Sequence, residues 1–471
     1  MYPLVEFPEL VQHYASFFAE VFSAEAFVEF QRYISGLIVS ENKTVEGINR
    51  LFVLESRNPS SLNRLLTESP FSLEALNRAR LGLLASLPGT QIKPKGVLGV
   101  DDTLLAHYGQ EFEKIAKLYD HVSKTYVWAH DWVTIHYSDE ETDYPVLFQL
   151  WEPVELEKLE AGLRAAQIPL KASKEPLKES HPNKWRSYLL GVWQRRQKQH
   201  AELRELYDSK LILAEKMLSQ WVAEHPQAHL PVTFDSWFTQ PDFCRFLDQE
   251  LHLAYVGTLT GTDRVNLKTG ETTLAEFALH LQQEHLEAIA HGGKPVFHRI
   301  SIPFKREHET YYSYCATHQI HGFRRHRLVI NHRQADLSDS PTFYLSNRLI
   351  WHAAGITHIR RHRWPVEVYH EEGKAEGLDQ YQLRDFGAIQ RHVALVAVVY
   401  SLLRAAQHDH DLRARLQRIL KVHLEGHPAS GRRAAQAQSL WCLGLFISAG
   451  LAQGQSLHKI LAPFLQSMCR A

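Results

Sequence analysis

Three aspartates stand where they could share a divalent cation. Asp101 and Asp102 directly follow the apolar run GVLGV, and Asp235 directly follows PVTF. Both runs are predicted to be strands of an open sheet, in which ligands bind beyond the carboxyl ends of the strands. Neighbouring carboxylates repel each other unless a proton or a cation lies between them. Each aspartate alone is typical of a turn that ends a strand, but together they indicate a metal site.

Such a site needs a third carboxylate, which the stretch RRHRWPVEVYHEEGK, residues 360–374, can supply. Mg²⁺ prefers carboxylate oxygens and keeps several waters. Two such ions about 4 Å apart can activate an attacking oxygen and stabilise a leaving oxygen in phosphoryl transfer. The chemistry indicated by these residues is therefore phosphodiester cleavage or transfer.

The stretch offers three glutamates. Proline suits the first turn of a helix, so a helix that begins near Pro365 places Glu367 in its first turn. At 100° per residue, Glu367 and Glu371 share one face with Lys374, whereas Glu372 points elsewhere. Helical geometry alone leaves Glu367 and Glu371 equal as candidates.

The elements that must position these residues divide into helical and β-rich parts. Apolar residues at three- and four-residue spacing predict helices at the start and the end of the chain. Between them, short apolar runs separated by polar turns imply a central sheet of about five strands flanked by helices. We therefore predict an α/β fold with five parts: 1–90, a helical domain; 91–264, the first part of a core; 265–345, a β-rich insertion; 346–425, the second part of the core; and 426–471, C-terminal helices. That the helical domain binds DNA and that the core is catalytic is what the family resemblance given below implies.

The composition limits the functions that fit. The formal net charge of the 471 residues is −1, so contact with nucleic acid must come from local basic patches. The four cysteines form no C-x-x-C pair, which argues against disulfides and for a reducing cytoplasm. The apolar runs HVALVAVVYSLL and WCLGLFISAGLA are too short to cross a bilayer and predict buried helices.

Histidine and arginine clusters add further candidates. The chain has 29 histidines but no H-E-x-x-H pattern, and His358 and His362 lack an acidic or cysteine partner at a fixed spacing. We therefore predict no histidine metal site. The segment HGFRRHR supplies candidate DNA contacts in the insertion: Arg324, Arg325 and Arg327.

The C-terminal candidate stretch resembles a signature of the DDE transposases of bacterial insertion sequences. In the branch with a β-rich insertion before the catalytic Glu, the signature is Tyr, two residues, Arg, three residues, Glu, six residues and Lys. Arg363, Glu367 and Lys374 match these spacings, and Trp364 after the Arg also looks like the family. One position departs from the signature, because Arg360 stands where the family has Tyr.

The resemblance extends to the aspartates. The first catalytic Asp of the family ends a strand before Thr or Ser, and VDDT matches; Asp102 is favoured because it abuts Thr103, with Asp101 as the alternative. The second Asp matches Asp235 in TFDSWF.

What the resemblance implies is an RNase H-like fold and cut-and-paste transposition in a bacterial cytoplasm, at the nucleoid. Asp102, Asp235 and Glu367 would hold two Mg²⁺ ions, for which Mn²⁺ can substitute. Arg360, Arg363, Trp364 and Lys374 would contact double-stranded DNA at the terminal inverted repeats. A homodimer would join the two ends to target DNA, and no membrane is involved. An RNase H-like nuclease without strand transfer and a domesticated DNA-binding protein are the alternatives.

Overall fold

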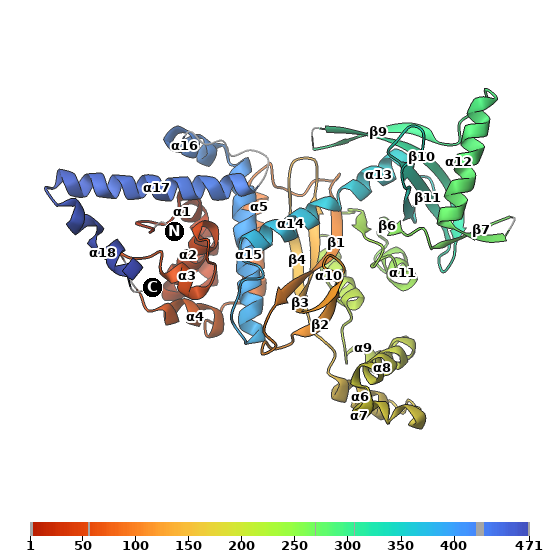
Figure 1. Cartoon of the computed structure of the whole chain (residues 1–471), viewed down its shortest axis with the longest axis horizontal. Helices are drawn as coiled ribbons and strands as arrows, with labels where there is room; N and C mark the ends of the chain where they lie inside the picture. The colour runs from red at the N-terminus through yellow and green to blue at the C-terminus, as the bar shows by residue number, and fades with distance from the viewer. Residues whose placement is uncertain (1–2, 55–56, 269, 306, 421–427, 470–471) are drawn as a thin grey trace.

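A mixed sheet forms the centre of the molecule (Figure 1). The computed structural model describes residues 3–54, 57–268, 270–305, 307–420 and 428–469. The central strands run in the order β4-β3-β1-β5-β6; β4, β3 and β1 are antiparallel, and β1, β5 and β6 are parallel. The predicted α/β class with a mixed sheet flanked by helices is confirmed, but the sheet has twelve strands in the described residues rather than about five. The bounds are β1 Val97–His107, β3 Thr125–Ser138, β4 Asp143–Trp151, β5 Val232–Phe234 and β6 Tyr255–Leu259.

The sheet continues from β6 into the predicted β-rich insertion. Strand β12 pairs antiparallel with β6, and β11, β10, β9 and the β7–β8 hairpin extend the sheet beyond it. The sequence missed the helix α12, Leu274–Ala290, which lies in this part. Its start carries a capping box between Thr273 and Glu276, a signal that T-x-x-E could have given. The strands are β7 Arg264–Leu267, β8 Gly270–Thr273, β9 His298–Phe304, β10 Glu307–Ile320, β11 Arg325–His332 and β12 Thr342–Ser346.

The first strand differs from its prediction. It does not stop at the aspartates but continues to His107, because the fourteen-residue β3 pairs with it along its whole length. Asp101 and Asp102 therefore lie inside a strand, and their side chains point to opposite faces of the sheet. The strand β2, Ala116–Asp120, was also missed and pairs with β3.

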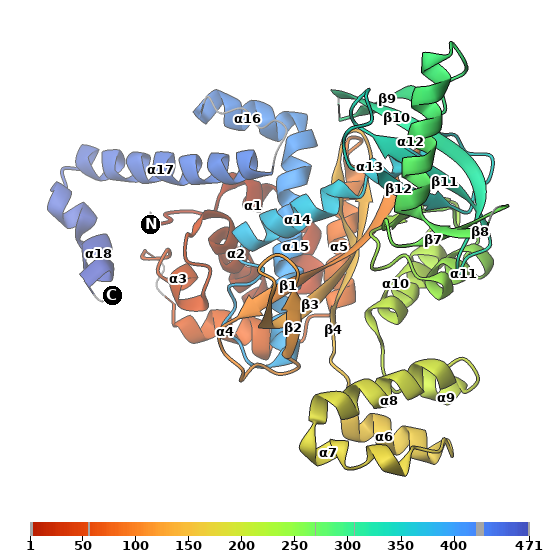
Figure 2. The same cartoon turned by 45° about the vertical axis from the view of Figure 1, so that its right-hand side comes forward.

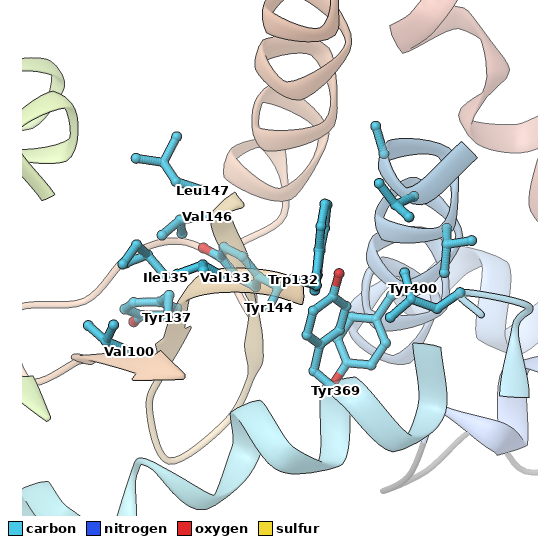
Figure 3. Close-up of a cluster of buried hydrophobic side chains, with 14 of the residues drawn as sticks. Val100, Trp132, Val133, Ile135, Tyr137, Tyr144, Val146, Leu147, Tyr369 and Tyr400 are labelled. Atoms are coloured by element: carbon cyan, nitrogen blue, oxygen red, sulfur yellow. The ribbon is translucent and has the colours of Figure 1, made fainter. Parts of the chain in front are cut away.

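The helix α15, Phe386–His408, is the buried axis of the helical layer and confirms the prediction of a buried helix for HVALVAVVYSLL. It packs on β4 and α14 on one side and on the N-terminal helices on the other. These N-terminal helices share one hydrophobic core with α15 and the sheet, so they do not have a core of their own. Figure 3 shows Trp132, Tyr369 and Tyr400 where the sheet, α14 and α15 meet. The helices are α1 Glu9–Tyr14, η1 Ala15–Val21, α2 Ala24–Val39, α3 Val45–Asn49, α4 Pro59–Thr67, α5 Leu73–Ser86, α13 Ala353–Arg361 and α14 Trp364–Ala375.

A helical lobe between β4 and α10 projects from the sheet (Figure 2). It has a separate small core around Trp185, Leu189 and Trp193. The lobe and the segments beside it consist of several short and medium-length helices. They are α6 Leu156–Ala165, η2 Ala172–Lys174, α7 Leu177–Ser180, α8 Pro182–Arg196, α9 Ala201–Arg204 and α10 Lys210–Glu224, followed after β5 by α11 Pro241–Gln249.

The C-terminal helices are α16 His410–Leu420, α17 Ala429–Ala452 and α18 Leu457–Cys469. The boundary predicted between 425 and 426 lies outside the described residues. Helices α15 and α17 are both long and apolar enough to cross a membrane by length and composition, a test that core helices of soluble proteins also pass. In α15, 83% of the apolar window is buried, but in α17 only 28% is. The prediction of a buried helix is therefore wrong for WCLGLFISAGLA.

A buried carboxylate links the sheet, α15 and the insertion. Asp143, at the start of β4, accepts hydrogen bonds from Arg404 Nη2 at 2.7 and 2.8 Å, from Tyr400 Oη at 2.7 Å and from Lys305 Nζ at 2.7 Å. Burial alone would raise the pKa of Asp143, but the Arg404 and Lys305 cations outweigh it and hold that pKa well below its usual range. Removing one partner of a buried ion pair leaves the other charge uncompensated, so this contact is a structural hub.

We predict that Asp143→Asn lowers the free energy of unfolding by about 3–5 kcal/mol, because Arg404 keeps its charge without a counter-ion. Chemical unfolding measures the loss, with the exposed Asp411→Asn as the control. In the wild type, this contribution is present above the unfolded pKa of about 4 and is lost as the pH falls through the lower folded value. A loss for Asp143→Asn no larger than for Asp411→Asn would contradict the assignment.

Candidate active site

The start of helix α14 lies directly over β1. A Cβ built on Gly99 would be 3.8 Å from Arg363 Cα, so the two backbones approach closely at this point. Asp101, two residues further along β1, points to the same face of the sheet. The helix is fixed here by Tyr369, whose ring packs edge-on against Tyr400 at 4.9 Å and lies 5.3 Å from the ring of His136. Packing on the sheet thus brings α14 to Asp101.

Arg363 joins two of the predicted carboxylates. Its Nη1 donates to Asp101 Oδ2 at 2.7 Å, and its Nη2 donates to Glu367 Oε1 one helical turn further on. The arginine and Asp101 are 262 positions apart in the chain. Their side chains are 11% and 13% exposed, and that of Glu367 is 32% exposed. The Arg363 guanidinium therefore lies between the largely buried carboxylate of Asp101 and the half-buried carboxylate of Glu367.

Asp235 directly follows β5, as predicted. Phe234 pairs in parallel register with Val100, so Asp235 is level with Asp101 on the neighbouring strand. Its Oδ1 accepts the backbone N–H groups of Trp237 at 3.0 Å and Phe238 at 3.1 Å. This turn fixes the carboxylate at the edge of the crevice beyond the sheet.

Burial and neighbouring negative charges raise the pKa values of two carboxyl groups in this cluster. Burial raises the pKa of Asp101 to about 7; Arg363 opposes that shift, and the charges of Asp235 and Asp102 add to it. Burial also raises the pKa of Asp235, with a further contribution from Asp102. A cation among these groups would relieve the repulsion.

The neighbouring Asp102 points to the opposite face. Its Oδ2 accepts from Lys210 Nζ at 2.9 Å, and the same ammonium lies 3.0 Å from Asp131 Oδ2 and 4.3 Å from the centre of the Trp237 ring. Burial and the Asp102 charge raise the pKa of Asp131. The sequence favours Asp102 as the first carboxylate, whereas this geometry favours Asp101, because only Asp101 shares a partner with Glu367.

The donor set of Asp101, Asp235 and Glu367 consists only of carboxylate oxygens, which fits Mg²⁺ or Mn²⁺. The oxygens of these three residues do not all lie within 4.8 Å of one another. The Arg363 guanidinium stands between Asp101 and Glu367, so a metal bound by both needs this side chain to withdraw.

The competing glutamates take no part in this contact. Glu371 is exposed, and Glu372 lies 3.9 Å from Arg432 on α17. Lys374 is half-buried near the end of α14, about two turns from Glu367. Helical geometry left Glu367 and Glu371 equal, and the tertiary contacts favour Glu367.

Arginines gather beside the carboxylates. A cavity of about 280 Å³ is lined by Arg333, Arg360, Arg361, Arg363 and Trp364 among others. Arg360 donates to Thr258 Oγ1 at 2.6 Å, and burial together with the charge of Arg363 lowers its pKa to about 10. Trp364 is 47% exposed, so it is not a core residue.

The predicted DNA contacts of the insertion, Arg324, Arg325 and Arg327, do not line this cavity. Arg324 and Arg325 are exposed at the start of β11, whereas Arg333 follows its other end, so roughly 25 Å of strand separates them from the cavity. Arg327 is held inside the protein, because its Nε donates to the carbonyl of Trp351 at 3.1 Å.

Two sets of charged residues in this part of the structure could not be identified from any sequence pattern. Lys210 and Asp131 come from an ordinary helix start and the middle of a strand. Glu140, in the turn SDEETD, lies beside His358 and His362, although the sequence predicted no acidic partner for these histidines. Cys244, Cys315 and Cys442 are free, as the cysteine pattern predicts.

The central sheet and its flanking helices define an RNase H-like fold, with carboxylates on neighbouring strands and on a helix that packs over them. A family model described as DDE superfamily endonuclease matches residues 16–272, more than half of the chain. The chain therefore belongs to the DDE superfamily endonucleases. The match includes all three aspartates and ends before α14.

No curated protein matches the chain. Among solved structures, the piggyBac transposase synaptic complex with hairpin DNA has 10% sequence identity and a TM-score of 0.39, covering 88% of this chain and 70% of that chain. The family assignment rests on the family model alone.

We predict that Arg363→Ala tightens Mg²⁺ binding about tenfold, because the metal no longer competes with a guanidinium and two carboxylates lose their cation. Calorimetric titration of the protein without DNA measures the affinity. Arg361→Ala is the matched control, since Arg361 pairs with Glu309 at 2.9 Å outside the cluster. Equal or weaker Mg²⁺ binding by Arg363→Ala would show that Arg363 does not occupy the metal position.

Proposed function

We propose that this protein is a cut-and-paste DNA transposase. The observation that carries the proposal is the convergence of Asp101, Asp235 and Glu367, from two neighbouring strands and the helix over them, around Arg363. The membership in the DDE superfamily supports endonuclease activity. In this proposal, Asp101 is the first catalytic carboxylate, the role for which the sequence favours Asp102.

The three carboxylates would hold two Mg²⁺ ions, which supply an activated oxygen nucleophile and stabilise the leaving oxygen when they are bound. Asp101 and Asp235 orient their oxygens toward the crevice, and Glu367 closes it from the helix. In hydrolysis, the oxygen of water bonds to phosphorus while the bond to the 3′ oxygen breaks, which leaves a 3′-OH and a 5′-phosphate. In strand transfer, that 3′-OH attacks a target phosphodiester and releases a new target 3′-OH.

Arg363 has two roles in this account. Without DNA, its guanidinium offsets the repulsion between Asp101 and Glu367. A DNA phosphate in the crevice offers it a charge-assisted, bidentate partner, and the carboxylates then accept metal. Arg363 would thereby couple the arrival of DNA to the assembly of the metal site.

The arginine-lined cavity favours contact with the DNA backbone beside the cut. Arg361 and Arg333 share Glu309, but the neighbour of Arg360 is the neutral hydroxyl of Thr258. The charges of Asp235 and Glu367 also act on Arg360, and a phosphate would be a further partner for this guanidinium, which stands where the family signature has a phenol. Trp364 is exposed at the same cavity and can stack on a base.

Three further basic residues outside this cavity would contact DNA. Lys374, on α14, would hold a phosphate about two turns from Glu367. The exposed Arg324 and Arg325 would contact DNA further from the cut. A homodimer that brings two element ends together and a location at the bacterial nucleoid complete the proposal.

The test is excision and joining of DNA that carries the inverted repeats flanking the gene, in the presence of Mg²⁺. We expect Asp101→Asn and Asp235→Asn to lower the cleavage rate by at least about a thousandfold, since each removes metal-binding charge. Asp102→Asn, the matched neighbour on the same strand, keeps cleavage within about tenfold of the wild type if its role is the contact with Lys210.

The outcomes separate the alternatives. Loss of cleavage in Asp102→Asn but not in Asp101→Asn would return the first carboxylate to Asp102. Cleavage without joining would support a nuclease that lacks strand transfer. Binding of the repeats with no cleavage by the wild type would support a domesticated DNA-binding protein.

A further inference from the structure

A second cluster of metal-binding side chains lies away from the carboxylates. Glu140, His358 and His362 present ligand atoms that all lie within 4.8 Å of one another. His358 Nε2 is 2.6 Å from Glu140 Oε1, and His362 Nε2 is 3.4 Å from the same oxygen. His358 lies on α13 and His362 is the C-cap residue of that helix, one turn further on, so their rings project from one face.

The buried histidine has a ring nitrogen that makes no hydrogen bond. His362 is 1% exposed, yet its Nε2 makes no hydrogen bond, while its Nδ1 lies 2.9 Å from Ser138 Oγ. A metal-binding histidine carries its proton on the other ring nitrogen and donates it to a fixed acceptor. Ser138 is placed to accept that proton, which leaves the Nε2 lone pair aimed at Glu140 and His358.

The charge balance around the cluster favours a cation. Glu140 supplies a carboxylate oxygen beside the two imidazole nitrogens. The nearby Lys305 ammonium is bound to Asp143, and only its backbone N–H donates to Glu140, at 2.8 Å.

We propose that Glu140, His358 and His362 form a zinc site that ties the two parts of the catalytic core together. Two imidazole nitrogens and one carboxylate oxygen are a ligand set that Zn²⁺ accepts, with water in the fourth position. Glu140 is 44% exposed and His358 27% exposed, so the ion can enter from solvent.

The position of the cluster defines its role. Ser138 pairs with Val97, four residues before Asp101 on β1, which puts the zinc site about 13 Å along the sheet from the proposed Mg²⁺ site. It joins the β3–β4 turn to the end of α13, directly before Arg363, and Lys305 connects the β9–β10 turn. A bound ion would fix the start of α14 and the insertion relative to the core. This role is independent of the transposase proposal.

The experiment compares zinc content and cobalt spectra of full-length wild type, Glu140→Gln and His358→Asn, after dialysis against excess Mg²⁺. The controls are Glu141→Gln in the same turn and His352→Asn before α13, both at exposed positions. We expect one Zn²⁺ per chain in the wild type and in the controls, and at least a tenfold weaker affinity in Glu140→Gln and His358→Asn. Asp101→Asn should keep its zinc.

Thermal unfolding provides a second readout. Zinc should raise the wild-type midpoint above its value in chelator, because it binds only the folded chain, and bound Co²⁺ should give the visible spectrum of tetrahedral nitrogen and oxygen ligation. If a variant fails to fold, the wild-type measurements with zinc and with chelator still test the proposal. The proposal would be overturned if no protein bound zinc, or if the variants bound as much zinc as the wild type. It would also be overturned if zinc left the wild-type unfolding midpoint unchanged.

Discussion

Repulsion between buried carboxylates is the constraint on which the rest of this structure depends. Asp101, Asp235 and Glu367 belong to segments far apart in the chain, and burial makes the charges of Asp101 and Asp235 unfavourable. The molecule tolerates them because Arg363 lies between two of them and because turn N–H groups support the third. The sheet, α14 and α15 then have to be rigid enough to hold this arrangement.

That rigidity comes from packing and from one buried ionic hub. Tyr369 and Tyr400 fix α14 against α15, and Asp143 fixes α15 and the insertion against the sheet. The same architecture places the Glu140 cluster at the junction of the core, the insertion and α13. Three separate groups of charges therefore bind the parts together around the start of α14.

The sequence was most informative where a local pattern has one physical meaning. The period of the apolar residues predicted helices and strands correctly in type, and Asp235 follows its strand as expected. The resemblance singled out Arg363 and Glu367, and the structure adds a direct contact between them that the sequence did not predict. Pro365 correctly indicated the first turn of α14.

Other features depend on pairing that no local pattern records. The first strand passes through the aspartates because β3 pairs with it, and this reverses the preference between Asp101 and Asp102. Glu140 meets His358 across 218 positions of the chain, and no spacing rule covers such a distance. A buried helix was predicted for the apolar run in α17, which is largely exposed, because composition does not show whether a helix packs against another element.

The most direct test of the central claim is anomalous diffraction from crystals of the protein with Mn²⁺ and DNA from a cleaved element end. The account predicts manganese between the carboxylates of Asp101, Asp235 and Glu367, with Arg363 moved onto a DNA phosphate. Manganese bound to Asp102 and Asp131 instead, or Arg363 still joining Asp101 to Glu367 beside cleaved DNA, would contradict it.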